Sequence, residues 1–243
     1  MRIAFAIYFG AEYTTSVGKR GPQRQLSDDA ICAAALELIS VDGLAALSMG
    51  SLARQLGASA SGLYRYFASK EDILVALQER AIRHYATHLN AAIEAASIRS
   101  ATLPPDAAAL ANVIVAFGQY LRHAHESPAE HRMIDAFLSA PQPILSDTGA
   151  RAVAEVLSSV EAMCARTLDA AVAAGALSAA DSRRRTHLLW AALHGLDHFR
   201  KRDRIQPETL RVGQLQRDLF SAMLAGFGAP DIALDLALRH SLP

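Results

Sequence analysis

The chain has 243 residues, 51% of them hydrophobic, so it is long enough to bury a sizeable core and too apolar to be disordered. Lysine plus arginine equal aspartate plus glutamate at 24 each, which excludes nucleic-acid binding through a strongly positive overall charge. Aromatic residues make up only 6% and alanine and leucine are abundant, which predicts an all-α protein.

Residues 1–26 are expected to form a flexible N-terminal extension that ends in a basic arm. Residues 1–10 are apolar behind one arginine, and three interpretations stay open: a flexible extension, a translation start near Val17 instead of Met1, or a weak export signal. Residues 18–24 are basic and rich in turn formers; they form either an arm that reaches into a DNA minor groove or an unstructured tail. No later apolar stretch approaches the roughly 20 residues of a membrane span, so we expect a soluble, cytoplasmic protein.

Residues 27–72 show the pattern of three short helices, the second and third joined by a tight turn. Ser27, followed by two acidic residues, is a helix N-cap signal, and a second helix starts after Ser48. Gly57 suits the left-handed position that ends this second helix, and Ser59 can cap the third. Two helices in this arrangement behind a first are typical of a helix-turn-helix DNA reader.

The third helix has two faces of different character. Ala60, Leu63 and Phe67 can pack against the other helices. The remaining positions cannot all be buried, and they include two tyrosines, Tyr64 and Tyr66, and Arg65 between them. Such a strip, bordered by small residues, suits contacts to phosphates and base edges. Core packing of Tyr64 and a merely solvated charge at Arg65 are the alternatives.

The order of residues over about 27–80 resembles the N-terminal domain of the tetracycline-repressor (TetR) family. The resemblance lies in Leu-Ser-Met-Gly-Ser-Leu-Ala-Arg-Gln-Leu-Gly at 47–57, Gly-Leu-Tyr-Arg-Tyr-Phe at 62–67 and Ser-Lys-Glu-Asp at 69–72. It implies that Ser48 and the start of the third helix meet DNA, that Tyr64 and Tyr66 bind phosphates, and that Lys70 holds another phosphate at a helix N-terminus. The full set of expected DNA-binding residues is Ser48, Ser59, Ala60, Ser61, Gly62, Tyr64, Arg65, Tyr66 and Lys70.

Residues 73–243 are expected to form a helical-bundle domain for ligand binding and dimerisation. A long helix starts at Ser69, and start and stop signals predict five more helical segments, at 105–125, 128–138, 147–174, 181–202 and 207–227. Residues 188–196 contain Trp190 and His194-Gly195 and resemble the Trp and His-Gly motif of one branch of TetR-family C-terminal domains. This second resemblance implies a bundle with an internal pocket, and dimerisation through the last two long helices.

The last long helix carries an apolar stripe wide enough for two partners. Val212, Leu215, Leu219 and Met223 are the residues expected to form the dimer contact. Simple burial within one chain is the alternative reading of the same stripe.

Two kinds of effector are compatible with the second half of the chain. All nine histidines follow residue 80, and the pairs His84/His88 and His194/His198 each share a helix face, as zinc or copper ligands do. A pair alone leaves further ligands unaccounted for, so we favour an organic effector and expect no metal or cofactor. The pocket expected to bind it is lined by Phe117, Met133, Phe137, Met163, Trp190 and His194.

These observations predict a ligand-responsive repressor that binds a palindromic operator as a homodimer, and not an enzyme. No Gly-rich phosphate loop, nucleophile elbow or metalloprotease motif is present in the sequence. A helical interaction protein without DNA binding is the other alternative, and it would need the strip around Tyr64 to be buried. Cys32 and Cys164 each sit in an apolar helical pattern and are expected to be buried free thiols.

Overall fold

The computed structural model describes residues 26–139, with the backbone alone at 137–139, and residues 143–242. All regular elements in these ranges are helices, which confirms the all-α prediction. The extension and basic arm expected at residues 1–26 lie, except for Leu26, outside the described residues. Within the described ranges, no helix combines the length and the apolarity needed to cross a membrane.

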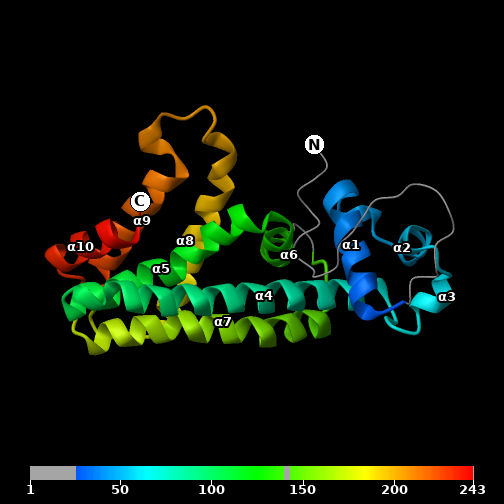
Figure 1. The fold of residues 1–243 in the computed structure, drawn as a ribbon, viewed down its shortest axis with the longest axis horizontal. Coiled ribbons are helices and arrows are strands. Elements are labelled where there is room, and N and C mark those ends of the chain that lie inside the picture. Colours follow the sequence, from blue (N-terminus) through cyan, green and yellow to red (C-terminus); the bar gives the residue numbers. More distant parts are fainter. Residues whose placement is uncertain (1–25, 140–142, 243) are drawn as a thin grey trace.

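Three helices and a short 3-10 turn form a head at one end of the molecule (Figure 1). They are α1 (Asp28–Asp42), the 3-10 helix η1 (Leu44–Ala46), α2 (Met49–Leu56) and α3 (Ala60–Leu63). The Ser27 side chain accepts a hydrogen bond from the backbone N–H of Ala30 at 3.2 Å, which confirms the expected N-cap of α1. The turn from α2 to α3 forms as expected, because Gly57 adopts the left-handed conformation with φ 63°.

Two long helices, α4 (Lys70–Arg99) and α7 (Asp147–Ala173), lie side by side along the molecule and carry the bundle (Figure 1). The helix α5 (Pro105–Glu126) packs against both. The apolar side of α4 is buried along most of its length, at Leu74, Leu77, Ile82, Tyr85 and Leu89. The long helix from the head therefore runs into the core of the bundle.

The remaining helices complete the bundle and differ from expectation at the C-terminal end. α6 (Pro128–Ser139) packs against α4 and α5, and α8 (Ser182–Phe199) packs against α5, α7 and α9 (Val212–Gly226). The segments predicted as single helices at 181–202 and 207–227 contain 3-10 turns, at Arg200–Arg202 and Glu208–Leu210. A further helix, α10 (Asp231–Ser241), was not predicted; it follows a turn at Gly228 with φ 96° and packs on α5 and α9.

The two cysteines match their prediction. Cys32 in α1 and Cys164 in α7 are both free and buried. Burial raises the pKa of the Cys32 thiol to about 11 and that of Cys164 to about 12, so both are uncharged at neutral pH.

Candidate DNA-binding and effector sites

Hydrogen bonds between residues close in sequence fix the geometry of α2 and α3. The Ser48 hydroxyl accepts from the Ser51 N–H at 3.0 Å, and the Ser48 N–H donates to the Ser51 hydroxyl at 2.9 Å. This reciprocal pair is a capping box, with Ser51 in the position usually taken by a longer side chain. Ser59 caps α3 by accepting from the Gly62 N–H at 3.1 Å. Both helices therefore start at defined points, which orients the short α3.

The two faces of α3 and the turn after it separate as a DNA-reading helix requires. Leu63 is completely buried and Phe67 nearly so, which attaches this segment to the head. Ala60 and Gly62 are half-buried. On the outer side, the exposed residues are Ser59, Ser61, Tyr64, Arg65 and Tyr66. A polar strip is thus open to solvent over an apolar anchor, and the core-packing alternative for Tyr64 is wrong.

The two tyrosines of this strip differ in what their hydroxyls can do. Tyr64 is 53% exposed, whereas the Tyr66 hydroxyl donates to the Leu26 carbonyl oxygen at 2.7 Å. A hydroxyl has only one proton to donate. In this conformation Tyr66 therefore ties the chain before α1 to the end of α3, and Tyr64 is the better placed of the two to donate to a phosphate.

The two other expected DNA contacts lie at helix starts. Ser48 is exposed, although its hydroxyl is already engaged in the cap of α2. Lys70 is the first residue of α4, and its Nζ donates to the Leu44 carbonyl oxygen at 3.3 Å. A phosphate at this helix start would meet the lysine charge and the free backbone N–H groups of the first turn together.

The pocket expected in the bundle is a narrow cavity of about 30 Å³ in this structure. It holds no more than one or two water molecules. Phe117 and Trp190 line it as expected, together with residues that the sequence reasoning missed: Tyr85, Tyr120, Glu161, Cys164 and Thr186. Tyr120 could have been found, because it lies three residues after Phe117 on the same face of α5.

The other expected pocket residues are dispersed around this cavity. Met163 is half-buried on α7, and Met133 instead lines a larger cavity of about 310 Å³ between α1, α4 and α6. The Nδ1 atom of His194 lies 2.8 Å from the hydroxyl of Tyr120, so His194 touches the cavity lining from outside. The side chain of Phe137 is outside the described part of the structure.

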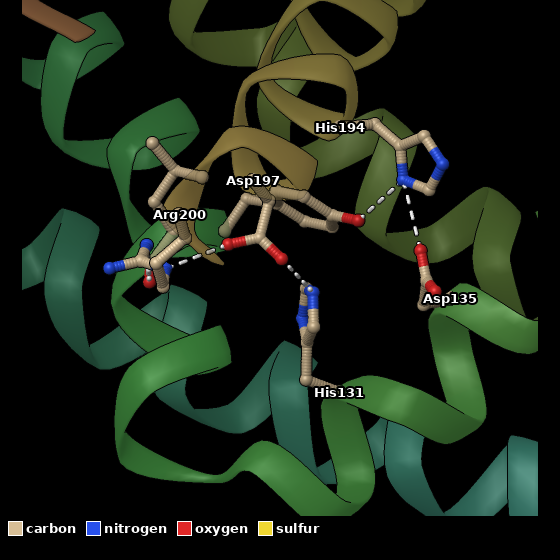
Figure 2. A network of polar contacts seen from close by, with 7 residues as sticks. His131, Asp135, His194, Asp197 and Arg200 are labelled. Atoms are coloured by element: carbon tan, nitrogen blue, oxygen red, sulfur yellow. Dashed lines mark hydrogen bonds and ion pairs between the residues drawn. The ribbon is translucent and has the colours of Figure 1, made fainter. Parts of the chain in front are cut away.

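A seam of polar side chains between α6 and α8 interrupts the apolar bundle (Figure 2). Asp197 of α8 lies between His131 of α6, at 3.3 Å, and Arg200, whose Nε lies 3.0 Å from the carboxylate. Burial raises the pKa of Asp197, but hydrogen bonds from His131 and Arg200 outweigh it, so the pKa lies below its usual value. The Asp197 carboxylate is therefore charged at neutral pH.

Three contacts connect α6 and α7 to the first half of α4. The Glu71 carboxylate accepts from the N–H and the hydroxyl of Ser146, the N-cap of α7, at 2.8 and 2.6 Å. These bonds lower the Glu71 pKa. About two helical turns further along α4, the Gln78 side chain donates to the backbone carbonyl of Met133 at 3.1 Å, and nearly two turns beyond it His84 pairs with Glu130. These contacts attach α6 and α7 to α4, the helix that follows the head.

Comparison with protein families assigns residues 31–77 to the family described as bacterial regulatory proteins, tetR family. The match covers α2, α3 and most of α1, and ends within α4. A comparison with curated proteins found no match.

Several solved structures share the fold over most of the chain. A regulatory protein of the tetR family from Rhodococcus RHA1 is 18% identical with a TM-score of 0.58, over 84% of this chain and 98% of that one. SmeT, the repressor of the multidrug efflux pump SmeDEF of Stenotrophomonas maltophilia, is 18% identical with a TM-score of 0.57. The match covers 86% of this chain and 93% of SmeT. The regulator FadR from Bacillus subtilis, in complex with stearoyl-CoA, is 18% identical with a TM-score of 0.59. The match covers 82% of this chain and 99% of FadR.

The geometry of α2 and α3 and the family match over residues 31–77 agree, and most of the chain has the fold found in these regulators. Residues 31–77 therefore match the tetR family of bacterial regulatory proteins, and the chain shares its fold with the solved regulators.

Proposed function

We propose that this protein is a ligand-responsive repressor that binds a palindromic operator as a homodimer, with α3 of each chain in a major groove. The observation that carries this proposal is the exposed strip of Ser59, Ser61, Tyr64 and Arg65 opposite the fully buried Leu63. A helix attached by one face and polar on the other is what major-groove reading needs.

Within this interface the residues would have different tasks. Tyr64 would donate to a phosphate, and Arg65 would read a base edge or a second phosphate. Ala60 and Gly62, with Ser59 and Ser61, would allow close approach of the backbone because their side chains are small. Ser48 and Lys70 would hold the DNA backbone on either side, each at the start of a helix.

Dimerisation would use α8 and α9. Leu215, Leu219 and Met223 are only half-buried in the single chain, whereas Val212 lies in the chain's own core and is not available to a partner. On α8 an exposed stripe of apolar and small residues recurs every three or four positions: Leu188, Ala191, Gly195 and Phe199. An apolar helix face left open in one chain is the usual mark of an interface, and small residues let two helices approach closely.

The effector would bind where Phe117, Tyr120 and Trp190 meet. The chain would belong to the branch of the family that has the Trp and His-Gly motif. Since the cavity is only about 30 Å³ here, an organic molecule would have to separate α5, α7 and α8 to enter. The contacts of Glu71 with Ser146 and of Gln78 with Met133 would pass that displacement to α4 and change the spacing of the two recognition helices. A dimer fits two half-sites only at a fixed spacing.

The test is a binding assay with palindromes from the region upstream of the protein's own gene. Full-length protein should bind one of them as a dimer, and Arg65→Ala should change the preference among single-base operator variants by about 1 to 3 kcal/mol if Arg65 reads a base. Arg239→Ala, a charge loss on the exposed side of α10, is the matched control and should leave DNA affinity unchanged. The proposal is contradicted if the unmodified full-length protein binds no duplex more tightly than the Arg65→Ala variant does.

The effector can be sought by a thermal-shift screen of small molecules with the same protein. The coupling between effector and operator must be reciprocal, so operator DNA should weaken effector binding by the factor, about 5 to 150, by which effector weakens operator binding. Equal effector affinities with and without operator would show that the bundle does not control the head.

A further inference from the structure

The polar seam brings together two histidines and a carboxylate from different helices. Asp135 projects from α6, and His194 and His198 project from successive turns of α8. One ligand atom from each of the three lies within 4.8 Å of the other two. In Figure 2 the carboxylate of Asp135 points to the imidazole of His194, with its Oδ1 atom 3.4 Å from Nδ1.

These separations suit a shared metal ion. A zinc ion binds histidine nitrogen and carboxylate oxygen at about 2.0 to 2.2 Å, so neighbouring ligand atoms of a tetrahedral site lie roughly 3.4 Å apart. The Asp135–His194 separation already has this value. The rings of His194 and His198 have their centroids 4.9 Å apart, and the exposed His198 would have to move closer to complete the site.

The chemistry of the three side chains selects the class of ion. Two imidazoles and one carboxylate suit zinc and its neighbours among the divalent transition metals, whereas calcium and magnesium favour oxygen ligands. We propose that Asp135, His194 and His198 form a binding site for a divalent transition metal ion such as Zn²⁺, which bridges α6 and α8. The proposal concerns this seam alone and does not rest on the operator-binding function proposed above.

Other polar side chains surround the three ligands. The Tyr120 hydroxyl lies 2.8 Å from Nδ1 of His194, the same atom that lies 3.4 Å from Asp135, so this hydrogen bond must open when the ion binds there. Two carboxylates, Asp135 and Asp197, face the seam.

The position of the site gives it a mechanical consequence. Asp135 is on the helix whose Met133 and Glu130 line the cavity between α1, α4 and α6. An ion that holds Asp135 to α8 would therefore fix α6 against the bundle, on the side that faces the head.

The experiment is a zinc titration of the metal-free full-length protein, with any purification tag removed, in competition with a chromophoric chelator. We expect one zinc ion per chain, not displaced by excess Mg²⁺. His198→Ala should weaken zinc binding at least about tenfold without unfolding the chain, because His198 is exposed. Asp135→Asn, which keeps the size of the side chain, should weaken it by a similar factor. His240→Ala, which removes an exposed imidazole from α10, should have no effect.

The proposal is overturned if full-length protein binds no zinc at micromolar concentration, or if both variants bind zinc as tightly as His240→Ala. Circular dichroism of each variant checks that its helices are intact. Operator binding is measured separately on the metal-free protein. Protein that binds operator but not zinc overturns the metal site alone, and protein that binds zinc but no operator overturns the proposed function alone.

Discussion

Tyr64 and Tyr66 allow the same single-atom change to be made at two positions with opposite expected results. Tyr64→Phe removes a hydroxyl from a residue that is 53% exposed. Tyr66→Phe removes a hydroxyl that donates to the Leu26 carbonyl at 2.7 Å. We expect the first change to weaken DNA binding and the second to weaken the fold.

The magnitudes follow from the partners of each hydroxyl. A hydrogen bond to a charged group contributes about 1.5 to 3 kcal/mol, and the lower value applies to a solvent-exposed phosphate contact. Two half-sites then lose about 3 kcal/mol together, which weakens operator binding roughly 150-fold. Tyr66→Phe should lower the free energy of unfolding by about 1 kcal/mol, whereas Tyr64→Phe should change it by less than about 0.5 kcal/mol.

Fluorescence anisotropy with a labelled duplex at fixed salt measures the DNA affinity, and urea unfolding measures stability. A phosphate contact carries no sequence information, so Tyr64→Phe should weaken binding to operator and to unrelated duplex by similar factors. If Tyr64→Phe binds both duplexes as tightly as the unmodified protein, the assignment of the α3 strip as the DNA-binding surface is refuted.

Three further predictions concern the turn of the head, the dimer face and the core. Gly57→Ala should destabilise the protein by about 1 to 2 kcal/mol in thermal unfolding, because φ is 63° there, and Gly57→Asn should cost less. Leu219→Arg places a charge on the proposed dimer face and should give monomers in sedimentation, unlike Leu236→Arg on α10; an unaltered dimer would mean that another surface is used. His123 is 1% exposed, and burial together with neighbouring histidines lowers its pKa to about 3. Between about pH 6.5 and 3, the unfolded chain therefore binds a proton at His123 that the folded chain does not bind. The free energy of unfolding should fall by about 2 kcal/mol from pH 7.5 to 5. His123→Leu should remove most of this loss in urea unfolding, and an unchanged pH dependence would assign it to other groups.

The head could be predicted closely because its structure depends on neighbours in sequence. Ser27 and Ser59 cap helices through N–H groups three residues away, and Gly57 ends α2 through its own backbone conformation. Such interactions act within one helical turn, so the residue types alone indicate them. The contact of Tyr66 with Leu26 spans 40 residues, and no local pattern indicated it.

The residues expected to line an effector pocket come together only in part, since they lie on separate helices. Phe117 and Trp190 do meet at one cavity. Met133, on α6, lines another, because its side chain faces α1 and α4. Helical periodicity shows which residues share a face of one helix, and it does not show which helix that face will meet.

The sequence by itself determined the helical class, the start and end of most helices and the DNA-reading type of the head, because capping, turn and periodicity signals are local. The tertiary structure alone decided that Val212 is buried while Leu219 stays half-exposed, that the cavity beside Trp190 is nearly closed, and that Asp135 meets His194. Asp135 and His194 are 59 positions apart on α6 and α8, and only the packing of those two helices in the bundle brings their side chains to 3.4 Å.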